Sequence, residues 1–283
     1  MKERIKNGII NSLGIMAFRF IKSQQFNLIK KNKQFKNIHK GERCFILGNG
    51  PSLKEVDFSL LKKEYVFTVN QLARRADYCE LSANYHLWSD FNFFDESNVT
   101  EELVLCMKAV NTSGNRVQCF FPADVKKFLD EHGISKEVDC NYFKLRTNFY
   151  EGFNEKIDFT KFTPCLSTVV HYAILLAVYM GFSEIYLLGV DTTQIMVQIK
   201  SFLMENDEND YSYEVTKSEK KRMEKLLEQH SLESYAHSFW HLLLTYRNLN
   251  EYCKRRDIKL INCSKITTID SIPRVPLECV LCK

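Results

Sequence analysis

The chain has 283 residues and a formal net charge of +4, which hides a strong asymmetry. Residues 1–43 hold eleven Lys or Arg and two Glu, whereas the rest of the chain is acidic. With no recognisable nucleic-acid module, this distribution argues against binding of nucleic acid. Ten scattered cysteines without a secretory signal predict reduced thiols in a cytoplasmic protein. Cys279 and Cys282 lack a second pair at zinc spacing, so we predict no metal site there.

Residues 1–40 form a basic N-terminal arm with an apolar patch between Ile9 and Phe18. The patch is too short and too interrupted to span a bilayer. It suits an interfacial amphipathic helix on anionic lipid, so we expect contact with the inner membrane surface. The alternatives are a helix that packs on the rest of the chain and an arm that binds a partner.

The next element is a short apolar run, Cys44–Leu47, which stops at the turn Gly48-Asn49-Gly50-Pro51-Ser52. A buried strand that enters a glycine-rich turn and then a helix is typical of nucleotide-binding α/β domains. Gly48 and Gly50 let the backbone approach a ligand closely, and Pro51 and Ser52 suit the first turn of a helix. The turn matches neither the dinucleotide fingerprint nor a Walker A sequence, and a plain tight connection is the alternative.

Short apolar segments alternate with amphipathic ones along the remaining chain. The predicted strands are Cys44–Leu47, Tyr65–Val69, Tyr85–Ser89, Leu103–Cys106, Val117–Phe121, Glu184–Val190 and Ile258–Asn262, and the predicted helices are Thr168–Met180, Ser218–Gln229 and Ser238–Arg256. A helix, a glycine stop and a buried strand follow one another in residues 167–190, which implies parallel crossovers. We therefore predict an α/β fold at residues 41–283, with a Rossmann-like, doubly wound, mostly parallel sheet and a lid at about residues 192–236.

Small, amide or carboxylate residues stand where five predicted strands end. These ends are Gly48-Asn49-Gly50, Asn70-Gln71, Ser89-Asp90, Gly189-Val190-Asp191 and Asn262-Cys263-Ser264. In doubly wound sheets a ligand binds outside the carboxyl ends of the strands. One polar strand end is routine, but five together favour a nucleotide site over plain turns.

Three blocks carry a resemblance to known proteins: residues 48–57 (GNGPSLKEVD), 69–71 (VNQ) and 181–191 (GFSEIYLLGVD). They resemble the bacterial sialyltransferases of glycosyltransferase family 42, and similar strings occur in a broader group related to the archaeal hydroxymethylpterin diphosphokinase. The resemblance covers residues 41–270 approximately. It implies a GT-A-like sialyltransferase variant of the fold and an inverting transfer of sialic acid, or a related acidic sugar, from a CMP-sugar donor.

The same resemblance implies roles for individual residues. Asn49 would contact the donor's phosphate region, Asn70 the ribose or base, and Ser167 would open the helix beside the nucleotide. His237 matches a catalytic base placed ahead of a long helix, where a neutral imidazole can accept the acceptor's proton. A structural role, or a metal pair with His241, is the alternative. The predicted donor-binding residues are Gly48, Asn49, Gly50, Ser52, Asn70, Gln71, Asp90, Ser167, Thr168, Gly189, Asp191 and Thr193.

The chain departs from the family pattern at positions expected to meet the negatively charged groups of the donor. Thr193 stands in place of the first of two phosphate-binding tyrosines, and Tyr211 or Tyr213 in the following loop could supply a catalytic phenol. Asp90 replaces an asparagine, and an arginine is missing before Ser167. These differences leave the donor sugar and its nucleotide open.

The predicted chemistry requires no cofactor or metal. Asp90 and Asp191 could jointly bind Mg²⁺ with diphosphate oxygens, whereas contact with ribose hydroxyls or the capping of a turn is the alternative for Asp191.

The leading prediction is a bacterial glycosyltransferase of lipopolysaccharide or capsule biosynthesis, acting on an oligosaccharide or glycolipid acceptor. The resemblance also leaves room for a homo-oligomer. The alternatives are a Mg-dependent diphosphotransferase, which would need ATP and a heteroaromatic pocket, and a non-catalytic nucleotide- or glycan-binding module. The block Val69-Asn70-Gln71 favours the glycosyltransferase.

Overall fold

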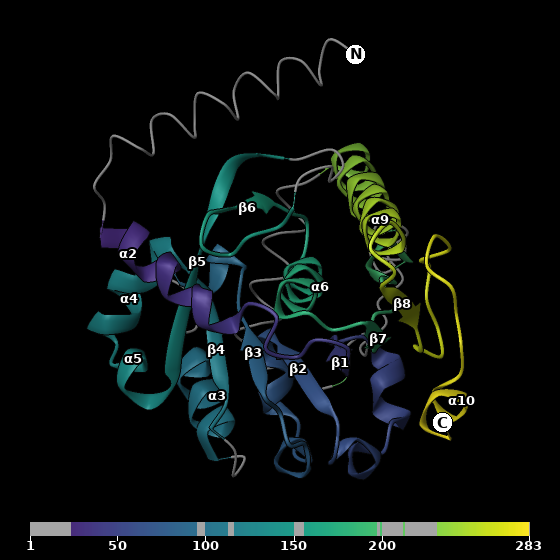
Figure 1. The fold of residues 1–283 in the computed structure, drawn as a ribbon, viewed down its shortest axis with the longest axis horizontal. Coiled ribbons are helices and arrows are strands. Elements are labelled where there is room, and N and C mark those ends of the chain that lie inside the picture. The colour runs from purple at the N-terminus through teal and green to yellow at the C-terminus, as the bar shows by residue number, and fades with distance from the viewer. Residues whose placement is uncertain are drawn as a thin grey trace.

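The computed structural model describes residues 24–94, 100–112, 116–149, 156–196, 199, 212 and 231–282. In this part of the chain eight strands form one sheet in the order β6-β5-β4-β3-β2-β1-β7-β8, and all neighbouring strands are parallel. The strands are β1 (Arg43–Leu47), β2 (Tyr65–Val69), β3 (Tyr85–Leu87), β4 (Gln118–Pro122), β5 (Asp139–Phe149), β6 (Phe162–Cys165), β7 (Glu184–Leu188) and β8 (Lys259–Asn262). Figure 1 shows them side by side across the molecule.

Helices cover both faces of the sheet, which confirms the predicted α/β, doubly wound fold. They are α2 (Gln24–Lys30), α3 (Thr100–Thr112), α4 (Lys126–Glu131), α5 (Ile134–Glu137), α6 (Val169–Met180), α9 (Leu232–Lys254) and α10 (Leu277–Leu281). One hydrophobic cluster joins the sheet to α6 and α9, and a second joins its other face to α3 and α10. Among the described helices none has the length and apolar character needed to cross a membrane.

Helix α6 is apolar on nearly every side because the sheet covers one face and α9 packs against another. It ends at Gly181, whose φ of 94° lets its N–H reach the carbonyls of Ala177 and Val178. This glycine stop is the one that the sequence predicts.

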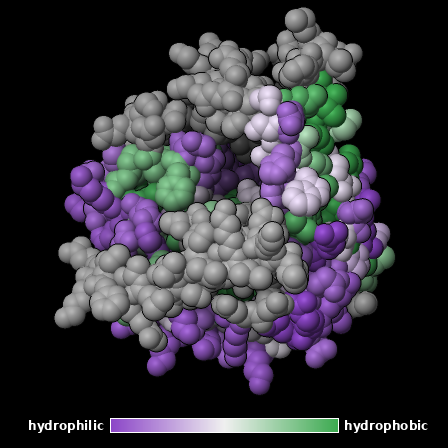
Figure 2. Space-filling view, turned by 90° about the horizontal axis from the view of Figure 1, so that it is seen from above, coloured by the Kyte–Doolittle hydropathy of each residue, from purple (hydrophilic) through white to green (hydrophobic). Residues whose placement is uncertain are grey.

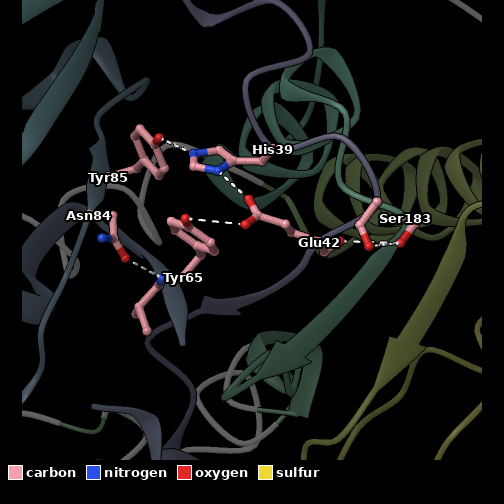
Figure 3. A network of polar contacts seen from close by, with 8 residues as sticks. His39, Glu42, Tyr65, Asn84, Tyr85 and Ser183 are labelled. Carbon is pink, nitrogen blue, oxygen red and sulfur yellow. Dashed lines mark hydrogen bonds and ion pairs between the residues drawn. The ribbon is translucent and has the colours of Figure 1, made fainter. Parts of the chain in front are cut away.

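Residues 24–42 are built into the domain. The amide of Asn32 donates to the carbonyls of Tyr142 (2.6 Å) and Phe159 (3.0 Å), and the N–H groups of Asn37 and His39 cap the last carbonyls of α6. Figure 3 shows His39 between Glu42 Oε2 (2.7 Å) and the hydroxyl of Tyr85 (2.6 Å). The second part of the predicted arm therefore packs on the sheet, whereas residues 1–23 lie outside the described residues.

Several predicted elements differ from the structure. Leu103–Cys106 is not a strand, since it lies within α3, and strands β5 and β6 were not predicted. The turn after β1 leads into a single 3₁₀ turn, Pro51–Glu55, rather than a longer helix. The predicted helix Ser218–Gln229 and most of the predicted lid lie outside the described residues.

The direction of strand order reverses between β1 and β7. From β1 the chain adds β2 to β6 on one side and then returns to place β7 and β8 on the other. In doubly wound sheets the crevice at this switch point is where ligands bind. The loops that leave β1 and β7 therefore define where the functional site should be sought.

Candidate functional site

A cavity of about 650 Å³ lies at this switch point. Its walls come from the loops after β1, β2, β3 and β7, the N-terminus of α6 and the first half of α9. Figure 2, seen from above, shows a hollow with hydrophilic residues along part of its border. The residues of the sequence prediction that line the cavity are Gly48, Asn49, Gly50, Asn70, Gln71, Asp90, Ser167, Thr168, Gly189 and Asp191.

The glycines after β1 serve close packing against the loop after β7. The N–H of Gly48 donates to Leu188, and the N–H of Gly50 donates to Gly189, each at 2.8 Å. A Cβ on Gly50 would lie 2.5 Å from the Cγ of Asp191. The N–H groups of both glycines are used in this contact, so the turn differs from a phosphate loop whose successive N–H groups bind the ligand.

Asp191 ties the two loops together. Its Oδ2 accepts from the N–H of Ser52 at 2.7 Å, and its Oδ1 accepts from the Ser52 hydroxyl. Burial raises the pKa of this carboxyl, and the two bonds from Ser52 oppose that shift. Ser52 consequently lies behind the cavity wall rather than in it.

With both oxygens engaged, Asp191 is poorly placed to share a Mg²⁺ ion with Asp90. The described residues also contain no group of three or more His, Cys, Asp or Glu that could hold a metal. The structure therefore supports a turn-holding role for Asp191 among the roles that the sequence left open.

Two asparagines present unpaired amide oxygens at the cavity. The Oδ1 atoms of Asn49 and Asn70 are buried and have no hydrogen-bond partner in the described part of the chain. Asn70 has a φ of 47°, a left-handed conformation that asparagine tolerates better than most residues. A buried acceptor without a hydrogen-bond partner is unfavourable, and the hydroxyl or amino groups of a nucleoside would be suitable donors.

The N-terminus of α6 forms the anion-attracting part of the wall. Ser167, Thr168, Val169 and Val170 all line the cavity, and the side chain of the N-cap residue Thr168 makes no capping hydrogen bond. The first N–H groups of a helix have no partner within it and carry a partial positive charge. No Lys or Arg is among the described residues of the wall.

Helix α9 supplies residues that the sequence analysis did not assign. Tyr235, Ser238, Phe239, Leu242 and Tyr246 line the cavity at the spacing of one helix face. The spacing was visible in the sequence, but the helix was predicted from Ser238 instead of Leu232. The omitted first turns begin at Ser231, whose side chain accepts from the N–H of Ser234.

The two histidines of α9 differ in position. His241 lines the cavity, whereas His237 is exposed and is not part of the wall. Their ring centroids are 4.6 Å apart. The prediction that His237 precedes the helix is wrong, because α9 begins five residues earlier.

Three other predicted site residues are not in the described wall. Thr193 is half-buried beside it, and the adjacent Thr192 lines the cavity instead. Tyr211 and Tyr213 lie outside the described residues. Between them, Ser212 donates its N–H to the carbonyl of Asn49 at 3.1 Å, so this point of the predicted lid contacts the site.

A family model described as "6-hydroxymethylpterin diphosphokinase MptE-like" matches residues 19–195. Curated protein sequences give no match.

Several solved structures resemble the chain at low identity. The sialyltransferase CstII from Campylobacter jejuni, solved with cytidine-5′-monophosphate, is 17% identical with a TM-score of 0.46, over 84% of this chain and 86% of that one. The MAf glycosyltransferase from Magnetospirillum magneticum AMB-1 is 14% identical with a TM-score of 0.48, over 89% of this chain and 38% of that one. An α-2,3-sialyltransferase from Campylobacter jejuni is 14% identical with a TM-score of 0.40, over 84% and 83%.

Proposed function

The chain belongs to the MptE-like family, and we propose that it acts as a glycosyltransferase whose donor is a sugar linked to a nucleoside monophosphate, a CMP-sugar. The observation that carries this proposal is the composition of the cavity wall. It combines buried amide acceptors, hydroxyl groups and a helix N-terminus, and no Lys or Arg is among its described residues. Such a wall can neutralise one phosphate charge through backbone dipoles.

From the position of the cavity we propose which part of the donor each part of the wall would bind. The phosphate would lie at the N-terminus of α6, near Ser167 and Thr168, where the N–H groups have no intrahelical partner. The nucleoside would meet the amide oxygens of Asn49 and Asn70 with its hydroxyl or amino donors. The cytidine base and the acidic sugar are inferred from the three sequence blocks described above.

Transfer of the sugar needs a base and a stabilised leaving group. We assign the base to His241, because it lines the cavity, with His237 beside it on the outer side. The acceptor hydroxyl would lose its proton to the imidazole as its oxygen bonds to the anomeric carbon. The bond from that carbon to the phosphate oxygen breaks, and the nucleotide leaves with the electron pair at the N-terminus of α6.

A diphosphotransferase is the second candidate, because the family is described by a diphosphokinase. Transfer of a diphosphate from ATP places more negative charge in the site and relies on a divalent cation. The wall has no described Lys or Arg, and Asp191 is engaged by Ser52. These features favour a donor with a single phosphate.

We also propose that lysines of the arm bind anionic lipid. Lys30, Lys31, Lys33, Lys36 and Lys40 are exposed, and none forms an ion pair with a described residue. Ile38 between them is 47% exposed. The end of this segment, residues 30–40, caps the C-terminus of α6, whereas the N-terminus of that helix, about 18 Å away at 1.5 Å per residue, faces the cavity. Contact through residues 30–40 would leave the cavity open to an acceptor away from the lipid.

A panel of nucleotides tests the proposed donor class. Thermal unfolding is followed with CMP, UDP, GDP and ADP, each with Mg²⁺ and with excess chelator. A monophosphate site predicts that CMP raises the melting temperature most and does so equally in chelator. A larger rise with ADP that depends on Mg²⁺ would favour the diphosphotransferase.

A further inference from the structure

The turn after β7 is held by a segment near the C-terminus. The N–H of Val190 donates to the hydroxyl of Ser264 (2.8 Å), and the carbonyl of Val190 accepts from Thr267 Oγ1 (3.0 Å). The carbonyl of Asp191 accepts from the N–H of Thr268 (3.0 Å). The segment Ser264–Thr268 therefore fixes consecutive peptide groups of a turn that lines the cavity.

Thr192 in this turn has an unusual backbone conformation. Its φ is 54°, in the left-handed region, where a β-branched residue is a genuine outlier. Thr268 holds it there, because Thr268 Oγ1 donates to the carbonyl of Thr192 at 3.0 Å and lies 2.6 Å from Thr192 Oγ1. Strained residues persist only where their surroundings fix them, and they cluster at functional sites.

The peptide N–H groups of Asp191, Thr192 and Thr193 make no hydrogen bond within the described part of the chain. Successive N–H groups in a turn with a left-handed residue form concave sites that bind anions. The turn borders the same cavity as the N-terminus of α6.

We propose that the turn Asp191–Thr193 is a preset anion subsite for the phosphate of the donor, and that Thr268 is its positioning residue. This rests on the proposed function, since it assigns the phosphate a second contact besides α6. The clamp Ser264–Thr268 lies beyond the residues that the family model matches, 19–195, so the subsite depends on a part of the chain outside that match. Thr268 acts through Thr192 and does not itself line the cavity.

Calorimetric titration of CMP and of cytidine separates the phosphate contact from the nucleoside contact. Thr268→Val keeps the shape of the side chain and removes its hydrogen bonds, whereas Thr268→Ser keeps the hydroxyl. We expect Thr268→Val to weaken CMP binding about tenfold and to leave cytidine binding unchanged, with Thr268→Ser close to wild type. Asn32→Ala is the control, because it also removes two side-chain hydrogen bonds, but these go to the carbonyls of Tyr142 and Phe159, which do not line the cavity.

The substitution Thr192→Gly supplies a rescue. Glycine adopts a positive φ without a clamp, so Thr192→Gly in the Thr268→Val background should recover CMP affinity. Unchanged CMP affinity in Thr268→Val, or equal losses for CMP and cytidine, would overturn the subsite while leaving the proposed function intact. If the wild type bound neither CMP nor cytidine, the proposed function would fail and the subsite with it.

Discussion

The carboxylate of Asp191 accepts hydrogen bonds from both the backbone N–H and the hydroxyl of Ser52, 139 residues earlier in the chain. This contact joins the loops after β1 and β7 at the switch point of the sheet. Asp191→Ala leaves both Ser52 donors buried and unpaired, and we expect it to lower the free energy of unfolding by about 2–4 kcal/mol. Ser52→Ala removes only the hydroxyl bond, so about 1–2 kcal/mol is expected. Urea unfolding measures the free energy of unfolding of both variants. If neither variant lost stability, the contact would not hold the two loops together.

The two histidines of α9 give the sharpest test of the catalytic assignment. His241 lines the cavity, whereas His237, one helical turn earlier, does not. Loss of a general base lowers turnover by about 10²–10⁴-fold, so His241→Ala should lose turnover by that order. His237→Ala should stay within about threefold of wild type, because it removes no group from the wall. The reverse ranking in a turnover assay would move the base to His237.

Stability should fall in mild acid because of buried histidines. Burial lowers the pKa of His171 to about 3, and neither ring nitrogen has a hydrogen-bond partner among the described residues. The folded-state pKa lies below the unfolded value of 6.5, so the unfolded state binds the proton more readily between these values. The group therefore costs stability as pH falls below 6.5, by about 1.4 kcal/mol per pH unit.

The variant His171→Leu isolates this contribution. Between pH 6.5 and 4.5, the free energy of unfolding of this variant should fall less steeply with decreasing pH, by about 1.4 kcal/mol per pH unit. Urea unfolding at several pH values measures this slope. Burial also lowers the pKa of His86 to about 3, so His86 should still make the stability of this variant depend on pH. An unchanged slope in His171→Leu would mean that His171 gains a partner or reaches water in the folded protein.

The exposed lysines near α6 predict salt-sensitive binding to anionic vesicles. Each Lys near such a surface contributes about 1 kcal/mol, so Lys33→Glu with Lys36→Glu should reduce partitioning at least about tenfold in co-sedimentation with phosphatidylglycerol vesicles. Lys54→Glu with Lys108→Glu changes the net charge equally at exposed positions outside residues 30–40 and should have little effect. Equal losses in the two pairs would attribute binding to net charge alone.

The hydrophobic pattern predicted the central strands and α6 well, and the elements at the β6 end of the sheet poorly. The central strand Tyr65–Val69 has its predicted bounds, and α6 differs by one residue, because both are mainly apolar segments with clear stops. The run Leu103–Cys106 is one turn of α3, and four apolar residues in a row cannot distinguish a strand from a turn of helix. Strand β6 spans four residues and contains Pro164, which argues against a strand in the sequence.

The residues of the candidate site that follow strand ends could be predicted from the sequence. The contacts between distant segments that hold these residues in place could not. Asn49, Asn70 and Asp191 follow strands whose carboxyl ends must meet, so their proximity follows from the parallel order. No local pattern could show that Asp191 binds Ser52, or that Thr268 clamps Thr192, because these pairs meet only after the sheet is assembled. The predicted resemblance to the hydroxymethylpterin diphosphokinase group is confirmed by the family match.

The most direct test of the proposed function is release of CMP from CMP-sialic acid in excess chelator, with and without an oligosaccharide acceptor. If the chain is a glycosyltransferase with His241 as base, the wild type should release CMP, and the acceptor should increase the rate. His241→Ala should bind CMP but not release it from CMP-sialic acid. Absence of CMP release, together with AMP formation from ATP that requires Mg²⁺, would contradict the proposal and identify the chain as a diphosphotransferase.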